Sequence, residues 1–479
     1  MIKQTCDLAR HGCAGMLVLA LLAGCASRDT TADPAQHVEL PPQWKGAAAA
    51  ASDQVVDPAG FWQQFDDPLL ASLIDDALAH NTDLRSAQAA LAQARARRDR
   101  ARAGWFPSLD AGVTARENRS GGVSSERYSA GLDAGWEVDL FRATARTVDA
   151  ATADLAASTA TRDGVQLALA GEVALAYVEV RANQLRLDIA QRSLAAQDET
   201  LALAGWRAQA GLASELDVAQ ARAAREQTRA QLATRDAALA TARHRLAVLT
   251  GRPPAALDDR LATAGPVPRA RRTPDAGIPA ETLRRRPDVR AAEQRLLAES
   301  ARLRATRAAR YPSLSLGGAL GVESLTAGGL AGGGTTTRSL LASLSVPLLD
   351  GGRRRADIAM QLAVHEQTIA AYEAVLLGAL QDVENTLAAR HGAAQRIEAL
   401  RAAADAAETA TMQARHRYAT GTIDFAALLD SERTLLSVQD SLALTVADET
   451  SAVISLYKAL GGGWTPQTEP PTAPQEDTP

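Results

Sequence analysis

Side chains that could carry out catalysis or bind a metal are few in this 479-residue chain and form no recognisable set. The chain has seven histidines, and His365-Glu366 is not followed by a second histidine four residues later, so the HExxH pattern of zinc hydrolases is absent. Glycine clusters such as Gly332-Gly333-Gly334 are not followed by Lys-Ser or Lys-Thr, so there is no Walker-type phosphate-binding loop. We therefore predict that the protein is not an enzyme and carries no metal or other cofactor.

The cysteines support one kind of covalent chemistry, which is acylation. Cys25 follows an apolar run of 11 residues (14–24), which is too short to cross a bilayer as a helix. The run ends in Leu22-Ala23-Gly24-Cys25, which resembles the lipobox of bacterial lipoproteins. This resemblance implies removal of a signal peptide (1–24) and S-diacylglycerol and N-acyl groups on Cys25. Because Ala26 is not aspartate, it also implies sorting to the outer membrane. An ordinary signal peptide with a chance cysteine is the alternative.

The charge balance argues against nucleic acid as a partner. The formal net charge is −5, and loss of the signal, with Lys3 and Arg10 against Asp7 (net +1), leaves −6. A mildly acidic chain lacks the basic surface typical of nucleic-acid-binding proteins. The other two cysteines, Cys6 and Cys13, leave with the signal, so the mature chain has no thiol for a disulfide, a metal site or a nucleophile.

The chain contains one pattern twice. Residues 83–109 align with 288–314 at an offset of 205, and further along the offset becomes 210, which pairs Gly211 with Gly421. The predicted segments are an acylated N-terminal region (25–67), a first repeat (68–252), a proline-rich connector (253–280), a second repeat (281–463) and a disordered polar tail (464–479).

Each repeat is predicted to end in two long helices. Prolines are absent from 108–252 and 348–465, and these stretches are rich in helix-favouring Ala, Leu, Arg, Glu and Gln. Apolar residues recur every seven positions, as in the series Val173, Val180, Leu187, Leu194 and Leu201. A sustained seven-residue period is typical of helices that supercoil around neighbours. The predicted helices cover about 143–210, 214–250, 353–419 and 424–460, and the first would be about 100 Å long.

Glycine interrupts each long helical run at one matched place. Gly211 and Gly421 can end a helix by adopting the left-handed conformation at low cost. Ser214 and Asp424 then suit the N-cap of the following helix. Each repeat is therefore predicted to contain a helical hairpin with a tight tip. The heptads alone are also compatible with a coiled-coil rod.

Four segments with period-2 alternation argue against a simple rod. They lie at about 107–117, 127–138, 312–323 and 338–348, and each has about the length of a tilted membrane-spanning strand. No segment of the mature chain has 18 consecutive apolar residues, so we expect no membrane-spanning helix. Aromatic residues at the strand ends are consistent with an interfacial girdle or with packing where strands meet helices. These residues are Trp105, Phe106, Trp136, Phe141 and Tyr311.

Four strands cannot close a barrel by themselves. Unpaired backbone groups at an open edge cost several kcal/mol each in lipid, so we expect the chain to oligomerise. A dimer would supply eight strands and a trimer twelve, and wider barrels are the ones that leave an aqueous lumen. The trimer is therefore preferred if the protein conducts.

Several short segments resemble the TolC-like outer-membrane factors, and in particular the lipoprotein branch of resistance-nodulation-division efflux systems. They are Phe61-Trp62-Gln63-Gln64-Phe65, Trp136-Glu137-Val138-Asp139-Leu140-Phe141, Arg285-Arg286-Pro287-Asp288-Val289, Leu349-Asp350-Gly351-Gly352-Arg353 and Tyr457-Lys458-Ala459-Leu460-Gly461-Gly462-Gly463-Trp464. The resemblance covers residues 40 to 465.

This resemblance implies a mixed α and β membrane protein. A homotrimer would form a 12-stranded β-barrel in the outer membrane and a 12-helix α-barrel in the periplasm, with an equatorial belt around it. It would act as the passive channel of a tripartite efflux pump, together with a periplasmic adaptor and an inner-membrane pump.

The resemblance also places a closed periplasmic aperture just after the second hairpin tip. Asp430 is the better candidate for a ring of carboxylates, because Asp424 suits an N-cap, and Ala426 stands where comparable channels often have a bulky apolar residue. Arg417 and Tyr418 are predicted to latch the tip to a neighbouring helix. The tips at Gly211-Leu212 and Ser214, and at Gly421-Thr422, are the expected adaptor contacts. Type I protein secretion and a non-conducting coiled-coil lipoprotein are the alternative functions.

Overall fold

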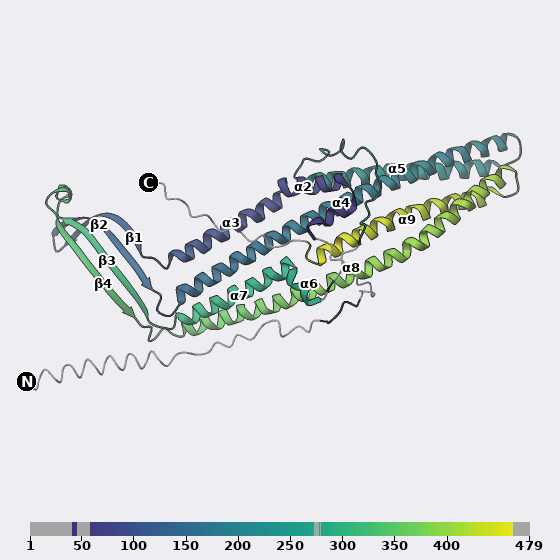
Figure 1. Cartoon of the computed structure of the whole chain (residues 1–479). Helices are drawn as coiled ribbons and strands as arrows, with labels where there is room; N and C mark the ends of the chain where they lie inside the picture. The colour runs from purple at the N-terminus through teal and green to yellow at the C-terminus, as the bar shows by residue number, and fades with distance from the viewer. Residues whose placement is uncertain (1–40, 46–57, 273–276, 278, 463–479) are drawn as a thin grey trace, which may run out of the picture. The chain divides into compact units, whose positions relative to one another are not determined.

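The computed structural model describes residues 41–45, 58–272, 277 and 279–462 (Figure 1). Cys25, the signal peptide and the predicted tail lie outside the described residues. The first repeat contains α2 (Pro68–His80), α3 (Thr82–Ala103), β1 (Ser108–Ser120), β2 (Val123–Val138), α4 (Ala143–Gln209) and α5 (Glu215–Leu249). The second contains α6 (Pro279–Arg285), α7 (Pro287–Ala308), β3 (Ser313–Ser324), β4 (Thr335–Ser345), α8 (Arg353–Ala419) and α9 (Phe425–Ala459). Two short 3-10 helices, η2 (Pro58–Phe65) and η3 (Ala327–Ala331), complete the described elements.

The long helices form two hairpins that pack side by side. α4 and α8 have 67 residues each, and α5 and α9 have 35 each. Along one part of their length α4 and α8 are neighbours of α3 and α7, and along the rest they are neighbours of α5 and α9 (Figure 1). The helical layer therefore has the order α3-α4-α7-α8 in one section and α5-α4-α9-α8 in the other, and α7 begins near the place where α9 ends. Within the described residues, no helix combines the length and apolarity needed to cross a membrane.

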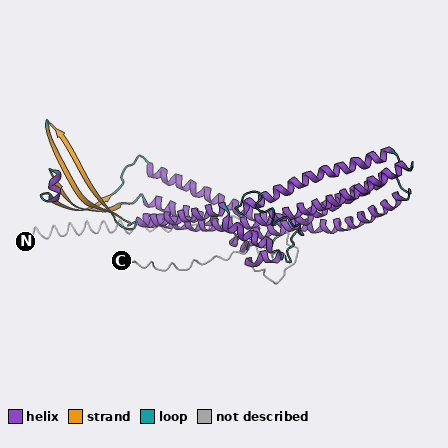
Figure 2. Ribbon diagram, turned by 90° about the horizontal axis from the view of Figure 1, so that it is seen from above, coloured by secondary structure: helices purple, strands orange, loops and turns teal. Residues whose placement is uncertain are grey.

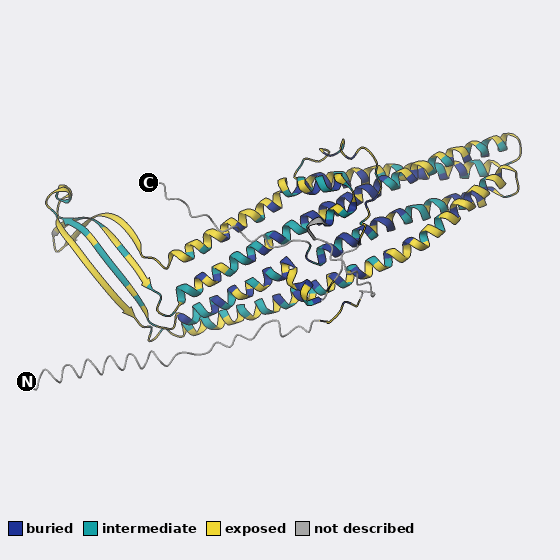
Figure 3. Cartoon of the chain, viewed as in Figure 1, coloured by how far each residue is buried: buried dark blue, intermediate teal, exposed yellow. Residues whose placement is uncertain are grey.

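The four strands form one antiparallel sheet in the order β1-β2-β3-β4 (Figure 2). The register places one apolar row after another on the same face, for example Ala111 beside Leu132 beside Leu320. The other face carries small and polar residues, for example Thr114 beside Ser129. The outer strands β1 and β4 are exposed and β3 is mostly half-buried, whereas the middle of the helical layer contains many buried residues (Figure 3). β1 and β4 are the outer strands of the sheet, so within the described residues each leaves one backbone edge unpaired.

The strand bounds differ from the prediction near the turns. β1 and β2 pair as far as Ser120 and Val123, across a tight turn at Gly121 and Gly122, whose φ angles are positive. Backbone pairing continues there although hydrophobic alternation has stopped, which is why the sequence pattern missed it. β4 runs from Thr335 to Ser345, three residues earlier than expected at both ends.

Two aspartates fix the start of the long helices after the sheet. Asp139 accepts hydrogen bonds from the backbone N–H groups of Thr144 (3.1 Å) and Ala145 (2.7 Å) at the start of α4. Asp350 accepts from Gly352 (3.0 Å) and Arg354 (3.3 Å) at the start of α8. A carboxylate at a helix N-terminus satisfies free donors and interacts well with the helix dipole.

A large hydrophobic core of the described residues lies where the two repeats meet. Phe61 of η2 stacks on Tyr457 of α9 with ring centroids 3.8 Å apart, and both side chains are buried. Tyr177 of α4 donates to Asp67 (2.7 Å), and burial, together with this bond, raises the pKa of Tyr177 to about 12. These contacts hold the segment before α2 against the first long helix and the last one.

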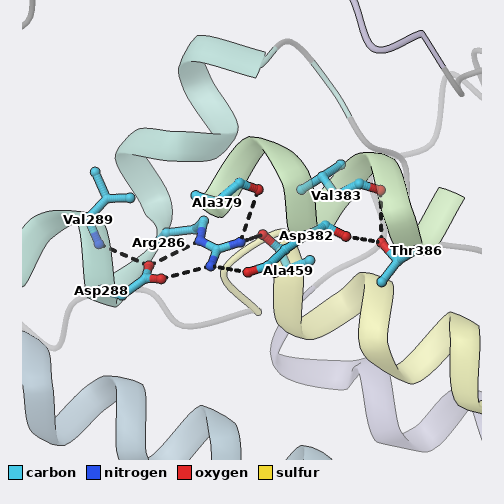
Figure 4. Close-up of polar contacts among 8 residues, drawn as sticks. All are labelled: Arg286, Asp288, Val289, Ala379, Asp382, Val383, Thr386 and Ala459. Atoms are coloured by element: carbon cyan, nitrogen blue, oxygen red, sulfur yellow. Dashed lines mark hydrogen bonds and ion pairs between the residues drawn. The ribbon is translucent and has the colours of Figure 1, made fainter. Parts of the chain in front are cut away.

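Arg286 joins three helices at the junction of α7 and α9 (Figure 4). Its guanidinium donates to both carboxylate oxygens of Asp288 (3.0 and 2.7 Å) and to Asp382 of α8 (2.9 Å). It also donates to the carbonyl of Ala459 (2.8 Å), the last residue of α9, where a cation is favourable. Burial raises the pKa of Asp288, but the bonds and charge of Arg286 outweigh it, so the pKa is lowered overall.

Replacing Arg286 should therefore weaken the junction between the repeats. We expect Arg286→Met to lower the free energy of unfolding by about 2 kcal/mol, because the buried cation is lost while its two carboxylate partners are half-exposed and can rehydrate. Thermal unfolding followed by circular dichroism would measure the effect. The adjacent Arg285→Met is the control, since that side chain is exposed. Equal midpoints for the two variants would contradict the role assigned to Arg286.

Candidate functional site at the hairpin tips

Both hairpin tips have the glycine-dependent turn predicted from the sequence. Gly211 and Gly421 have φ angles of 73° and 75°. In the first tip the N–H of Leu212 donates to the carbonyl of Arg207 (2.7 Å), and in the second the N–H of Thr422 donates to Arg417 (2.8 Å). These bonds satisfy carbonyls that the helix ends would otherwise leave free.

The first residues after each tip cap the next helix. Ser214 accepts from the N–H of Asp217 (3.2 Å), and the Asp217 carboxylate accepts from the N–H of Ser214 (3.1 Å), which completes a capping box. Asp424 accepts from the N–H of Ala427 (2.9 Å) and caps α9. Leu212 and Thr422 are exposed at the tips.

A cation of the first hairpin holds the second hairpin close to its tip. Arg207 of α4 donates to the carbonyls of Tyr418 (2.8 Å) and Ala419 (2.9 Å) at the end of α8. Its guanidinium carbon also lies 4.9 Å from the centroid of the Tyr418 ring. Arg207 thereby combines a helix C-terminal contact with a cation–π contact.

Tyr418 and Arg417, the two residues predicted to form a latch, are placed differently. Tyr418 is buried, packs edge-on against Phe425 (5.5 Å), and lies beneath Arg207. Burial and the nearby Asp217 carboxylate raise the pKa of Tyr418. The Arg417 side chain is exposed and makes no hydrogen bond or ion pair to any described residue. Within this chain the contact between the hairpins is made by Arg207, the counterpart of Arg417 in the first repeat, which the sequence analysis did not single out.

A buried carboxylate forms the next contact between the hairpins. Glu432 of α9 is 4% exposed and accepts from Thr200 of α4 (2.8 Å) and from Arg415 of α8 (3.0 and 3.1 Å). Three helices therefore meet at one oxygen, Oε1, while Oε2 is buried without a hydrogen bond. Such a group is costly to bury unless its partners stay in place.

Asp440 of α9 forms a third contact further from the tips. It accepts a bidentate pair of bonds from Arg186 of α4 (2.8 and 3.0 Å) and lies 3.0 Å from Arg235 of α5. Burial raises the pKa of Asp440, but the two arginines outweigh it and the pKa is lowered. The two hairpins are therefore linked at three levels by polar side chains.

The start of α9 presents a small exposed face. Phe425, Leu428 and Leu429 are buried against the other hairpin. Ala426 and Asp430, which are four residues apart on one helix face, are exposed, and the Asp430 carboxylate makes no hydrogen bond or ion pair to any described residue. The bulky apolar residue of this stretch, Phe425, therefore belongs to the hairpin core. Asp430 is the first charged group of this exposed face, and the exposed Arg433 follows three residues later.

The aromatic residues at the strand ends are partly paired and partly exposed. Phe141 stacks on Tyr311 with centroids 4.9 Å apart, and the indole N–H of Trp136 donates to the carbonyl of Trp105 (3.1 Å). Trp105, Phe106, Trp136 and Tyr311 nevertheless remain exposed. The two contacts are packing at the junction of strands and helices, and the interfacial girdle stays a prediction.

The described residues contain no group of three or more metal-ligating side chains. The combination of an exposed sheet with one apolar face, long paired helices and polar contacts between hairpins is that of a membrane channel protein.

Comparison with known proteins identifies the family. The profile described as "Outer membrane efflux protein" matches twice, at residues 73–252 and 278–462, once in each repeat. The chain is 32% identical to "Outer membrane protein OprJ" of Pseudomonas aeruginosa, over 95% of this chain and 96% of that protein. It is 29% identical to "Probable outer membrane lipoprotein SilC" of Salmonella typhimurium, over 93% and 97%.

Among solved structures, the outer-membrane channel OprN is similar with a TM-score of 0.84 and 34% identity, covering 89% of this chain and 97% of that one. The chain belongs to the outer membrane efflux protein family. It is an outer-membrane channel of an efflux system, as the sequence resemblance predicted, and the family is one of channels and not of enzymes.

Removing the Arg207 contact should loosen the second tip. We expect Arg207→Gln to increase hydrogen exchange of the amides around Tyr418 and Gly421 by about tenfold, because one charge-assisted contact is worth about 1.4 kcal/mol. Arg417→Gln is the matched control, since that side chain has no partner in the described residues. Hydrogen-exchange mass spectrometry of both purified variants would show the difference. A similar increase in both variants would show that Arg207 does not hold the tip.

The Asp440 contact should make the packing of the hairpins sensitive to acid. A carboxylate with a lowered pKa stabilises the fold above its ordinary value of 3.8 and loses that contribution as the pH falls through the folded pKa. We expect Asp440→Asn to cost about 1–2 kcal/mol at neutral pH and less near pH 3, where the contribution has begun to fall.

Thermal unfolding at the two pH values would test this expectation. Asp448→Asn is the control, because Asp448 is exposed and lies 3.8 Å from Arg396. An Asp440→Asn variant that is equally destabilised at both pH values would contradict the electrostatic explanation.

Proposed function

We propose that the chain acts as a homotrimer that forms a passive conduit across the outer membrane and the periplasm. The observation that carries this proposal is the sheet, whose two outer strands have unpaired edges and whose apolar face is exposed. Joining β1 of one copy to β4 of the next would pair every edge, and three copies give twelve strands with their polar face inward. The helical layers would close in the same way into a tunnel of twelve helices.

The long hairpins fit a protein that reaches toward partners in the periplasm. We propose that their tips, at Leu212 and Thr422, contact a periplasmic adaptor and that an inner-membrane pump of the resistance-nodulation-division type supplies the energy. The chain itself needs no catalytic residues for this role. SilC is named as an outer membrane lipoprotein, and this likeness supports acylation of Cys25. The cargo would be set by the pump and not by the conduit.

Asp430 is proposed as the residue that lines the periplasmic aperture. It is exposed on the first turns of α9, close to the tip where the hairpins are held together. In a trimer the three copies of this carboxylate would approach one another and favour cations in the narrow part of the channel.

The proposed conduit should be a trimer with discrete conductance. We expect the detergent-purified, acylated protein to have a trimeric mass and to form cation-preferring channels in planar bilayers. A monomer or dimer without conductance would instead favour a non-conducting structural lipoprotein.

Asp430→Ala should raise the conductance of the purified channel, because it removes charge and volume from the aperture. Asp405→Ala, an equal change at an exposed position on α8 away from the tip, is expected to leave conductance unchanged. Single-channel recordings would measure both variants. Unchanged conductance in Asp430→Ala would remove this residue from the aperture.

A further inference from the structure

A cavity of about 630 Å³ lies within the helical layer where α7 begins and α9 ends. Its walls come from α4, α7, α8 and α9, and Arg286, Asp382, Thr386 and Ala459, drawn in Figure 4, are among its lining residues. The layer has α3 and α5 at one edge and α8 at the other, so edge-to-edge contacts between copies would not fill a space between α4 and α9. Its volume is typical of pockets that bind small organic molecules.

The lining combines apolar walls with cations. Val165, Leu167, Ala168 and Val375 contribute apolar surface. The two lining carboxylates, Asp288 and Asp382, both accept hydrogen bonds from Arg286, which balances one of their two negative charges. Two further cations, Arg295 and Lys458, line the same space. The cavity therefore has an excess of positive charge beside apolar surface.

Lys458 is held in position without a partner for its charge. Its side-chain stem lies across Gly171 of α4, where a Cβ atom would come within 2.7 Å of Lys458 Cγ. The half-buried lysine side chain makes no hydrogen bond or ion pair to any described residue. Arg295 donates to the hydroxyl of Thr161 (3.1 Å), which is also part of the lining. Both cations are thus placed at the cavity, and Lys458 is available to a ligand.

This arrangement is not repeated in the other half of the chain. At the offset of 210, Lys458 corresponds to Val248 and Gly171 corresponds to Gln381. If Lys458 and Gly171 served only to pack the long helices, we would expect the same residue types at the matching positions of the other repeat, because both repeats contain the same pair of long helices. The lysine and the glycine that makes room for it belong to the second junction alone.

We propose that this cavity is a binding site for an amphipathic organic anion. The acidic head group would bind Lys458 and Arg295, and the apolar body would lie against Val165, Leu167 and Ala168. The ligand chemistry could be supplied by an anionic membrane lipid or by a free amphiphile such as a cargo molecule. The site rests on the geometry of one chain and does not depend on conduction.

The probe for this proposal is decanoate, which has one carboxylate and an apolar chain. Equilibrium dialysis with radiolabelled decanoate, using the full-length protein in dodecyl maltoside and a blank with detergent alone, should show one saturable site per chain. We expect the double variant Lys458→Met, Arg295→Met to bind about tenfold more weakly, because charge-assisted contacts are lost while the stems remain. Decanol has no charge to pair with the two cations. Its affinity for the wild-type protein should therefore be no higher than the affinity of decanoate for the double variant.

Two further variants separate the site from general effects of charge or folding. Ala168→Phe keeps both cations and should block binding by filling the cavity. Arg284→Gln, Arg285→Gln removes two exposed charges from α6 and should leave binding unchanged. Equal binding of decanoate and decanol, or unchanged binding in both the double methionine variant and Ala168→Phe, would overturn the proposal.

Analysis of what the purified protein carries would distinguish a membrane lipid from a free amphiphile as the natural ligand. Mass spectrometry of a solvent extract would reveal an anionic phospholipid carried by the wild type and absent from the double methionine variant if the ligand is a lipid. Wild-type protein that binds decanoate but carries no such lipid would point to a free amphiphile. Conductance measured on the same preparations is a separate readout, so failure of the conduit proposal and failure of the site are distinguishable.

Discussion

The constraint on which this structure depends is the need to pair the backbone of an open sheet. Hydrocarbon offers no hydrogen-bond partner, so every unpaired N–H and C=O at the edges of β1 and β4 would be costly there. A single chain has four strands and cannot remove those edges. The side chains are also sorted by the register, because most apolar residues lie on one face and most polar and small residues lie on the other. Assembly is therefore required by the backbone before any side-chain contact between copies is considered.

The two repeats supply equivalent strands and helical hairpins to each chain. They differ at positions where a side chain makes a contact in one repeat only. Asp139 and Asp350 start α4 and α8 in the same way, and Gly211 and Gly421 turn the two hairpins with nearly the same φ angle. In contrast, Arg207 contacts Tyr418 while its counterpart Arg417 is exposed. The same is true of Lys458, whose counterpart is Val248. Positions that differ between the repeats are therefore better guides to function than positions that agree.

The sequence predicted the family, the order of the elements and the tips because these depend on local signals. Period-7 and period-2 patterns, glycines with positive φ and N-cap residues each act within a few residues. The turn ends of β1, β2 and β4 were missed because backbone pairing continues where hydrophobic alternation stops, and the other end of β4 was missed because pairing stops at Ser345, before Pro347, while the alternation continues. Arg207, Glu432 and Asp440 were missed for a different reason. Their partners lie more than 200 residues away or on another helix, and no short pattern encodes such a contact.

These distant contacts fix how the long helices are aligned with one another. A heptad seam of Ala and Leu residues is uniform along its length, so apolar packing alone would tolerate a shift of one helix past another. The charged contacts are directional and fix the register at three levels, at Arg207, Glu432 and Asp440. Each is a small group of hydrogen bonds, and none of them involves the core around Phe61 and Tyr177. The register near the tips therefore depends on these polar groups, whereas the junction where the repeats meet depends on apolar packing.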